Sequence, residues 1–207
     1  MKLRQERTLI ALEKELSGLI VPARPVIRPV LSSEINTPPI PSSTQSKEKF
    51  LSNVIFDNDK VRMCAMGNFA QEKLGNDRTS SPTVDTISVM VAIQKVQQQQ
   101  LHMTTVEFDS AYFNAILERE VNTIIGKVEA AMLTQLRPEW TSFIRKDRTM
   151  LVRIIRALCS LPECSKLFYD VMCQVFLRLG YHKSTIDAAG FIKKAKDHQQ
   201  DIIINKT

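Results

Sequence analysis

The chain has no long apolar run, few glycines and no paired cysteines, and each lack excludes a class of protein. Its longest apolar run, 89–93, is far shorter than the roughly 20 residues that a membrane-spanning helix needs. Only six glycines occur in 207 residues, and neither GxGxxG nor GxxxxGK followed by Ser or Thr is present, which excludes these two phosphate loops. The four cysteines form no CxxC pair, so we expect buried, reduced thiols and not a zinc site.

The charge pattern near the N-terminus argues against a targeting segment. Acidic and basic residues mix through the first twenty positions, whereas a secretory signal has an apolar stretch and a mitochondrial presequence is poor in acids. We therefore expect a cytoplasmic or nuclear protein that is not secreted and has no membrane partner. The formal net charge of +6 permits a nucleic-acid partner without requiring one.

Proline divides the chain into three parts. Residues 1–20 predict an amphipathic helix, because leucines recur there at spacings of three and four. Six of the nine prolines fall within 21–46, which we interpret as a Pro- and Ser-rich linker without helix or central strand. The composition of 47–207 is that of a folded domain.

This domain mixes helical and strand patterns, which predicts an α+β fold. A helix over 84–100 is expected to start at an N-cap, Thr83, and two further helices are expected at 127–136 and 163–179. The residues expected on the buried side of the first helix are Ile87, Met90, Val91 and Ile93. A polar loop is expected at 72–81 and a turn or short helix at 109–116. Strands are expected at 61–66, 103–108, 121–125, 149–155, 190–193 and 201–204.

Two carboxylates lie at the end of the strand predicted at 103–108. Glu107 and Asp109 are two residues apart, so a strand would direct both side chains to one face, where divalent-metal chemistry is often built. The alternative is a solvated Glu107 and an Asp109 that caps a short helix.

Basic residues gather on both sides of the first predicted strand. They offer either a solvated face or a surface that contacts phosphates. These residues are Lys47, Lys49, Lys60, Arg62, Lys73 and Arg78.

Five segments, in order along 47–207, resemble the reverse transcriptase domain of copia-type LTR retrotransposons. KVRMCAMGNFAQ (60–71) is similar to the family's KARLVAKGFxQ, and SSPTV (80–84) is identical to its frequent SSPTV. VEFDSAYFNAIL (106–117) resembles DVxSAYLNAxL, and RALCSLPECSKLFYD (156–170) resembles KALYGCVESAKLWYD. The last segment, LGYHKSTIDAAGFIKK (179–194), resembles LGFxxSxxDxCVFxK.

The resemblance implies a fingers-and-palm polymerase fold, with an incomplete palm sheet backed by helices. It implies template-directed addition of deoxynucleotides to a primer, with two Mg²⁺ ions as cofactor. The implied partners are an RNA or DNA template-primer, a deoxynucleoside triphosphate and the remaining parts of a pol polyprotein. The implied nucleotide-binding residues are Lys60, Arg62, Ser110, Ala111 and Tyr112. Glu163 and Lys166 are implied to lie beside the template-primer.

The chain departs from the family at the catalytic carboxylates. The family's first catalytic aspartate aligns with Glu107, which is one methylene longer and is the expected catalytic residue and metal ligand. The family's YVDD segment is missing. Either the chain stops before that segment, or 199–205 is its decayed remnant with Asp201 as a second catalytic residue. In both cases we expect that this chain alone does not hold Mg²⁺.

These observations predict a reverse transcriptase fragment without polymerase activity of its own. One alternative is a non-catalytic, basic remnant that binds nucleic acid. Another is a remnant that folds poorly and has no molecular function.

Overall fold

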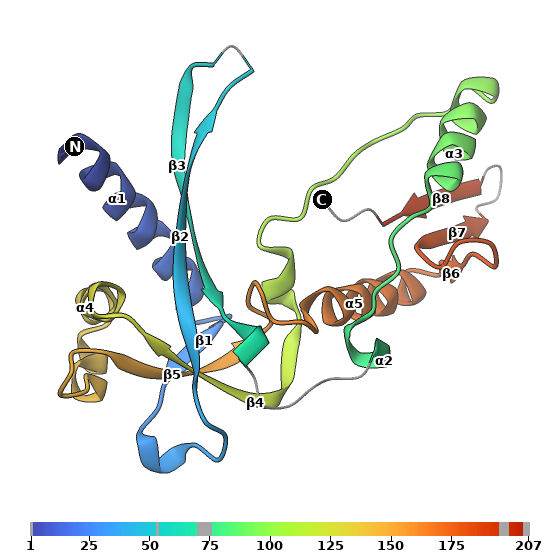
Figure 1. Ribbon diagram of the computed structural model, residues 1–207. Helices are drawn as coiled ribbons and strands as arrows, with labels where there is room; N and C mark the ends of the chain where they lie inside the picture. The colour runs from blue at the N-terminus through green and yellow to red at the C-terminus, as the bar shows by residue number, and fades with distance from the viewer. Residues whose placement is uncertain (1, 53, 70–75, 195–198, 205–207) are drawn as a thin grey trace.

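A computed structural model of the chain describes residues 2–52, 54–69, 76–194 and 199–204, and it has the mixed α+β class expected from the sequence (Figure 1). The α-helices are α1 (Lys2–Leu19), α2 (Asn76–Thr79), α3 (Thr86–Gln98), α4 (Lys127–Leu136) and α5 (Cys164–Arg178). The strands are β1 (Ile27–Pro29), β2 (Ile40–Phe50), β3 (Phe56–Ala65), β4 (Ile116–Ile125), β5 (Met150–Arg156), β6 (His182–Lys183), β7 (Gly190–Lys194) and β8 (Gln199–Ile203). Short 3₁₀ helices are η1 (Ser32–Glu34), η2 (Gly67–Phe69), η3 (Ala111–Asn114) and η4 (Pro138–Phe143). None of the helices in these ranges combines the length and apolarity needed to cross a bilayer.

The larger sheet has five strands in the order β1-β5-β4-β2-β3. Neighbouring strands are antiparallel except β2 and β4, which pair in parallel at Ile40 and Pro41. The apolar side chains of β4 and β5 lie in one cluster with those of α1 and α4, and this cluster includes Leu16, Ile125 and Ile154. The helix expected over 1–20 and the strands expected at 121–125 and 149–155 are therefore confirmed.

The prediction that 21–46 holds no central strand is wrong, because β2 lies between β4 and β3 in the larger sheet. β1 and the first part of β2 lie inside this segment, and β2 continues through position 47. Proline fits here because Pro29 ends an edge strand and Pro41 stands at the start of β2, where a missing N–H costs little. Apolar residues between the prolines join the core of the larger sheet. These buried residues are Val26, Ile27, Val30 and Ile40.

β2 and β3 form a long two-stranded ribbon whose turn lies at the far end from the sheet (Figure 1). α1 packs along β3, where Val61 and Met63 share an apolar cluster with Leu16. The guanidinium of Arg7 lies 4.1 Å from the centroid of the Phe56 ring. The ribbon is thus held to the body by α1 along one of its two faces.

The smaller sheet has the order β6-β7-β8 and packs against α5. The rings of Phe176 on α5 and Phe191 on β7 have centroids 5.0 Å apart, and Phe191 is fully buried. α5 is followed by Gly180 with φ 84°, a left-handed conformation that suits glycine after a helix. The helix at 163–179 and the strands at 190–193 and 201–204 are confirmed within a few residues.

α3 forms where a helix was expected, but its N-cap and its buried side differ from the prediction. The cap is Asp85 and not Thr83, because the Asp85 carboxylate accepts a hydrogen bond from the Ile87 N–H at 2.8 Å. The helix contacts β8 through Lys95, and its apolar side faces outward, since no described element covers it. The exposed residues are Ile87, Met90, Val91 and Ile93.

The strand expected at 103–108 does not form, because no described strand pairs with this segment. Backbone groups in a strand need such a neighbour to satisfy their hydrogen bonds. The side chains of Met103, Val106 and Phe108 are exposed.

The loop expected at 72–81 contains α2, and 72–75 lie outside the described residues. The turn expected at 109–116 is confirmed as η3.

Candidate functional site

The two predicted catalytic carboxylates lie on different elements with different neighbours. Glu107 is exposed in the irregular segment before η3. Asp201 lies on β8 opposite Ile192, and its Oδ2 is 2.6 Å from the Nζ of Lys95. Within the described ranges, no three His, Cys, Asp or Glu side chains gather in a way that suits a metal ion.

η3 places the next three predicted residues against α5. Ser110 has φ 51° and ψ 40°, and its carbonyl accepts the Phe113 N–H at 2.9 Å, which closes the turn. Ala111 begins the turn. The ring of Tyr112 meets that of Phe168 edge-on at 6.0 Å, and its hydroxyl lies 3.4 Å from the Ser165 hydroxyl. Tyr112 is therefore held between the two apolar clusters of the molecule.

Lys60 and Arg62 lie on the face of the β2–β3 ribbon opposite to Val61 and Met63, the residues that pack with α1. The register pairs Lys60 with Lys47, Arg62 with Gln45, and Asn58 with Lys49. Residues directly opposite each other in a pair of strands share one face. Lys47, Lys49, Lys60 and Arg62 therefore share this face, which we call the basic face.

The acidic residues of the ribbon lie on the opposite face and are paired with α1. Glu48 pairs with Asp59 in the register. The Glu48 carboxylate lies 3.3 Å from Arg7 and 3.6 Å from Arg4, and Asp59 lies 3.5 Å from Arg7. The ribbon thus separates its charges, with acids neutralised on one face and cations gathered on the other.

The environment of Lys60 reflects this gathering of cations. Partial burial lowers the pKa of Lys60 most, and the positive charges of Arg62 and Lys49 lower it further. Glu107 and Asp109 act in the opposite direction on the same pKa. These two carboxylates therefore lie close enough to Lys60 to affect its pKa.

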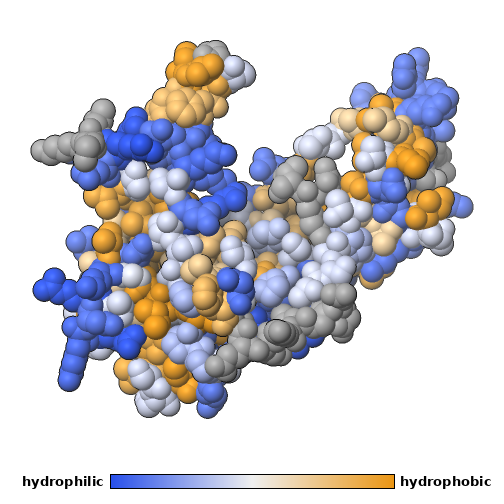
Figure 2. All heavy atoms as spheres, in the orientation of Figure 1, coloured by the Kyte–Doolittle hydropathy of each residue, from blue (hydrophilic) through white to orange (hydrophobic). Residues whose placement is uncertain are grey.

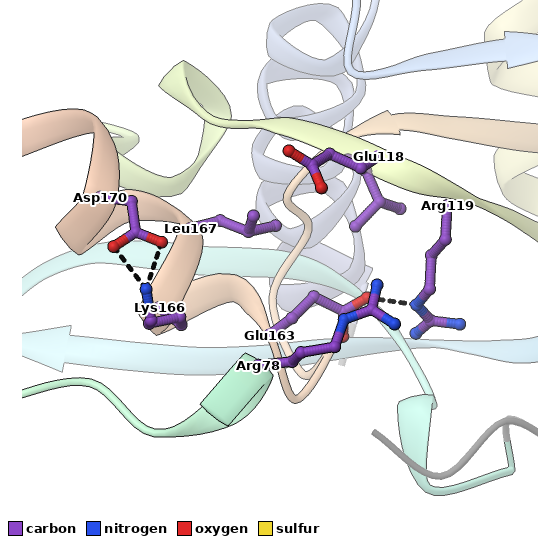
Figure 3. Close-up of a pocket in the computed structure, with 8 residues that line it drawn as sticks. Arg78, Glu118, Arg119, Glu163, Lys166, Leu167 and Asp170 are labelled. Atoms are coloured by element: carbon purple, nitrogen blue, oxygen red, sulfur yellow. Dashed lines mark hydrogen bonds and ion pairs between the residues drawn. The ribbon is translucent and has the colours of Figure 1, made fainter. Parts of the chain in front are cut away.

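Glu163 and Lys166 line a pocket of about 170 Å³ between α5, β4 and α2 (Figure 3). The side chain of Glu163 is 6% exposed, and its Oε1 accepts a hydrogen bond from Arg119 Nε at 2.6 Å. Lys166 is bound to both carboxylate oxygens of Asp170 (Figure 3). The two predicted template-side residues do lie together, and each is already held by a partner within the chain.

The sequence reasoning missed Arg119 and Asp170 as parts of this pocket. Asp170 follows Lys166 by four residues on one helix, and side chains at this spacing are neighbours on the helix surface. The ion pair could therefore have been predicted from the sequence. Arg119 lies 44 residues before Glu163, and only the packing of β4 beside the start of α5 brings them together. No local pattern signals such a pair.

Comparison with known proteins assigns the chain to no family. No protein-family model, no curated protein and no solved structure matches the chain. The likeness to copia-type reverse transcriptases therefore remains a prediction from five short segments.

Proposed function

We propose that this chain is a non-catalytic nucleic-acid-binding unit of reverse-transcriptase type, which contacts the phosphate backbone with the basic face of the β2–β3 ribbon. The observation that carries the proposal is the separation of charge on the ribbon. Lys47, Lys49, Lys60 and Arg62 share one face, while Glu48 and Asp59 face α1. A row of cations of this kind suits a polyanion and carries no sequence preference.

The pairing of Lys47 with Lys60 supports an anionic ligand. Like charges directly opposite each other in two strands destabilise the pair. A phosphate placed between the two ammonium groups would convert this repulsion into attraction. The lowered pKa of Lys60 would rise toward its ordinary value when such an anion binds.

We expect no primer extension by the chain alone. A two-metal mechanism needs carboxylates clustered around both ions. Glu107 lies in an exposed irregular segment near Lys60, and Asp201 is engaged by Lys95. The described residues therefore do not suit the two Mg²⁺ ions of the family, and we derive no catalytic step through them.

The binding proposal is tested by fluorescence anisotropy with a labelled single-stranded RNA and a DNA of the same sequence, titrated at several salt concentrations. The logarithm of the binding constant should fall linearly with that of salt concentration. The double variant Lys47→Gln/Lys60→Gln should reduce the slope by about 0.7 per removed contact. The matched control, Lys14→Gln/Lys146→Gln, removes the same net charge at exposed positions outside the basic face and should keep the slope.

Two results would overturn the proposal. Equal loss of affinity in both double variants would show that net charge, and not the basic face, drives binding. A primer-extension signal that depends on Mg²⁺ and disappears in Glu107→Ala would show that the chain is a polymerase.

A further inference from the structure

The turn of the β2–β3 ribbon carries an apolar surface that the proposed function does not use. Phe50 is 54% exposed, Leu51 52%, Val54 81% and Ile55 56%. We call these four residues the apolar tip. The space-filling view shows an apolar cap at the end of the ribbon, above a band of polar residues (Figure 2). Exposed apolar groups of this kind mark contact sites in soluble proteins.

The tip keeps an apolar residue, Val54, at a position where its backbone conformation is strained. Val54 has φ 63°, a left-handed conformation that β-branched residues rarely adopt and that glycine or asparagine would adopt readily. Its N–H donates to the Leu51 carbonyl at 2.9 Å, so the turn holds this conformation. A valine at this position costs stability and leaves its side chain exposed, which points to a role outside the fold.

Three lysines lie behind the tip on the basic face of the ribbon. Lys49 directly precedes Phe50, while Lys47 lies three residues before it and faces Lys60. A strand rises about 3.4 Å per residue, so Lys47 lies about 10 Å behind Phe50. Glu48 and Asp59 are paired with arginines of α1 and do not neutralise these lysines.

We infer that the apolar tip inserts into the interface of a membrane that carries anionic lipids, with the lysines behind it on the headgroups. An apolar element enters such an interface by about 5–10 Å, which matches the reach of the tip and its lysines. The tip also lies at the far end of the ribbon, beyond α1, so it can meet a planar surface (Figure 1). This is a peripheral contact without a spanning segment, and it departs from the prediction of no membrane partner.

The shape and chemistry of the tip favour lipid over a nucleic acid. Leu51, Val54 and Ile55 have no flat ring on which a base can stack. Phe50 and Phe56 meet edge to face at 6.1 Å, and Arg7 covers Phe56. The acyl boundary requires no such flat surface, and the charge of the lysines complements phosphatidylserine.

The test is sedimentation of the full chain with vesicles of phosphatidylcholine, with and without phosphatidylserine. The chain should bind the anionic vesicles and bind more weakly as salt rises. Leu51→Ser/Ile55→Ser should lower the partition coefficient at least about tenfold. The matched control, Leu31→Ser/Ile186→Ser, alters exposed apolar residues away from the ribbon and should bind like the parent.

A second variant separates binding from folding. Val54→Asn should raise the melting temperature by relieving the left-handed strain, yet lower the partition coefficient. Both tip variants should keep the affinity for RNA, because the basic face is intact, so this inference and the proposed function fail independently.

Three results would overturn the inference. The first is no binding to anionic vesicles at low salt, and the second is equal binding by tip variants and parent. The third is that tip variants lose RNA binding or self-association, seen by anisotropy and analytical ultracentrifugation, with vesicle binding unchanged. That result would assign the tip to a nucleic acid or to a second copy of the chain.

Discussion

The helices α1 and α3 have similar apolar patterns but opposite surroundings. Leu12, Leu16 and Leu19 of α1 are buried in the cluster that α1 forms with the larger sheet and α4. The apolar residues of α3, among them Ile87 and Met90, are exposed, and the helix touches β8 through an ion pair. The same periodicity thus forms a helix in both places, but a core in only one of them.

The difference shows that amphipathic periodicity predicts a helix but does not predict what its apolar side packs against. α1 packs against Val61 and Met63 of the β2–β3 ribbon. In contrast, no apolar surface among the described residues faces the outer side of α3. Helical stability in proteins comes mostly from such packing. We therefore expect substitutions in α1 to change the stability of the chain much more than substitutions in α3.

The largest effect is expected at the centre of α1. Leu16 is fully buried, so Leu16→Ala should lower the free energy of unfolding by about 3 kcal/mol, through lost burial and the cavity left behind. Chemical denaturation followed by circular dichroism measures this change. Ile10→Ala on the same helix is the control, because Ile10 is exposed and its loss should cost less than about 0.5 kcal/mol. Equal effects would show that α1 is not docked as described.

A smaller effect is expected at the polar anchor of α1. Arg7→Met removes the cation from the Phe56 ring and from Asp59, whose side chain is 2% exposed, and should cost about 2 kcal/mol. The buried carboxylate left without its partner accounts for most of this loss. Adding Asp59→Asn should restore part of the stability in a double-mutant cycle. If the two losses simply add, Arg7 and Asp59 are not coupled.

Substitution of Glu15, also on α1, should raise the stability of the chain at neutral pH, whereas the two preceding substitutions lower it. Burial raises the pKa of Glu15 above its ordinary value of 4.5, although the Met63 N–H donates to its carboxylate at 3.1 Å and lowers the pKa in part. The contribution of this group to stability is present below pH 4.5 and is lost as pH rises through the folded-state pKa. Glu15→Gln should therefore stabilise the chain at pH 7, because the amide oxygen can still accept from Met63. The gain should be only about 0.5 kcal/mol, since the side chain is partly exposed and solvent screens its charge. The gain should vanish near pH 4, and a gain of equal size at both pH values would contradict the burial argument.

Local patterns in the sequence predicted most elements, and they failed where a distant neighbour decides the outcome. The bounds 127–136 match α4, because apolar spacing and the following Pro138 are local signals. The strand at 103–108 failed for lack of a partner strand, and the prolines within 21–46 concealed an edge strand and the start of β2.

For the candidate site too, local patterns predicted the residue types, but not the contacts between residues distant in the sequence. The cations around Lys60 and Arg62 were visible in the sequence, but their separation from Glu48 and Asp59 depends on the register of β2 and β3. The pair of Arg119 and Glu163 depends on the position of α5 beside β4, and the pairing of Asp201 with Lys95 depends on the position of α3. None of these distances is encoded in a short segment.

The smallest effect is expected on the outer side of α3. Met90→Ser should change the free energy of unfolding by less than about 0.5 kcal/mol, because the side chain is exposed and loses little burial. Amide hydrogen exchange should show faster exchange in α3 than in α1, since few buried apolar contacts protect it. Lys95→Met is the companion variant, because it removes the ion pair with Asp201 and should speed exchange in α3 without changing α1. A loss above about 2 kcal/mol in Met90→Ser, or equal protection of both helices, would show that another surface covers α3 in solution and that the contrast between the two helices does not hold.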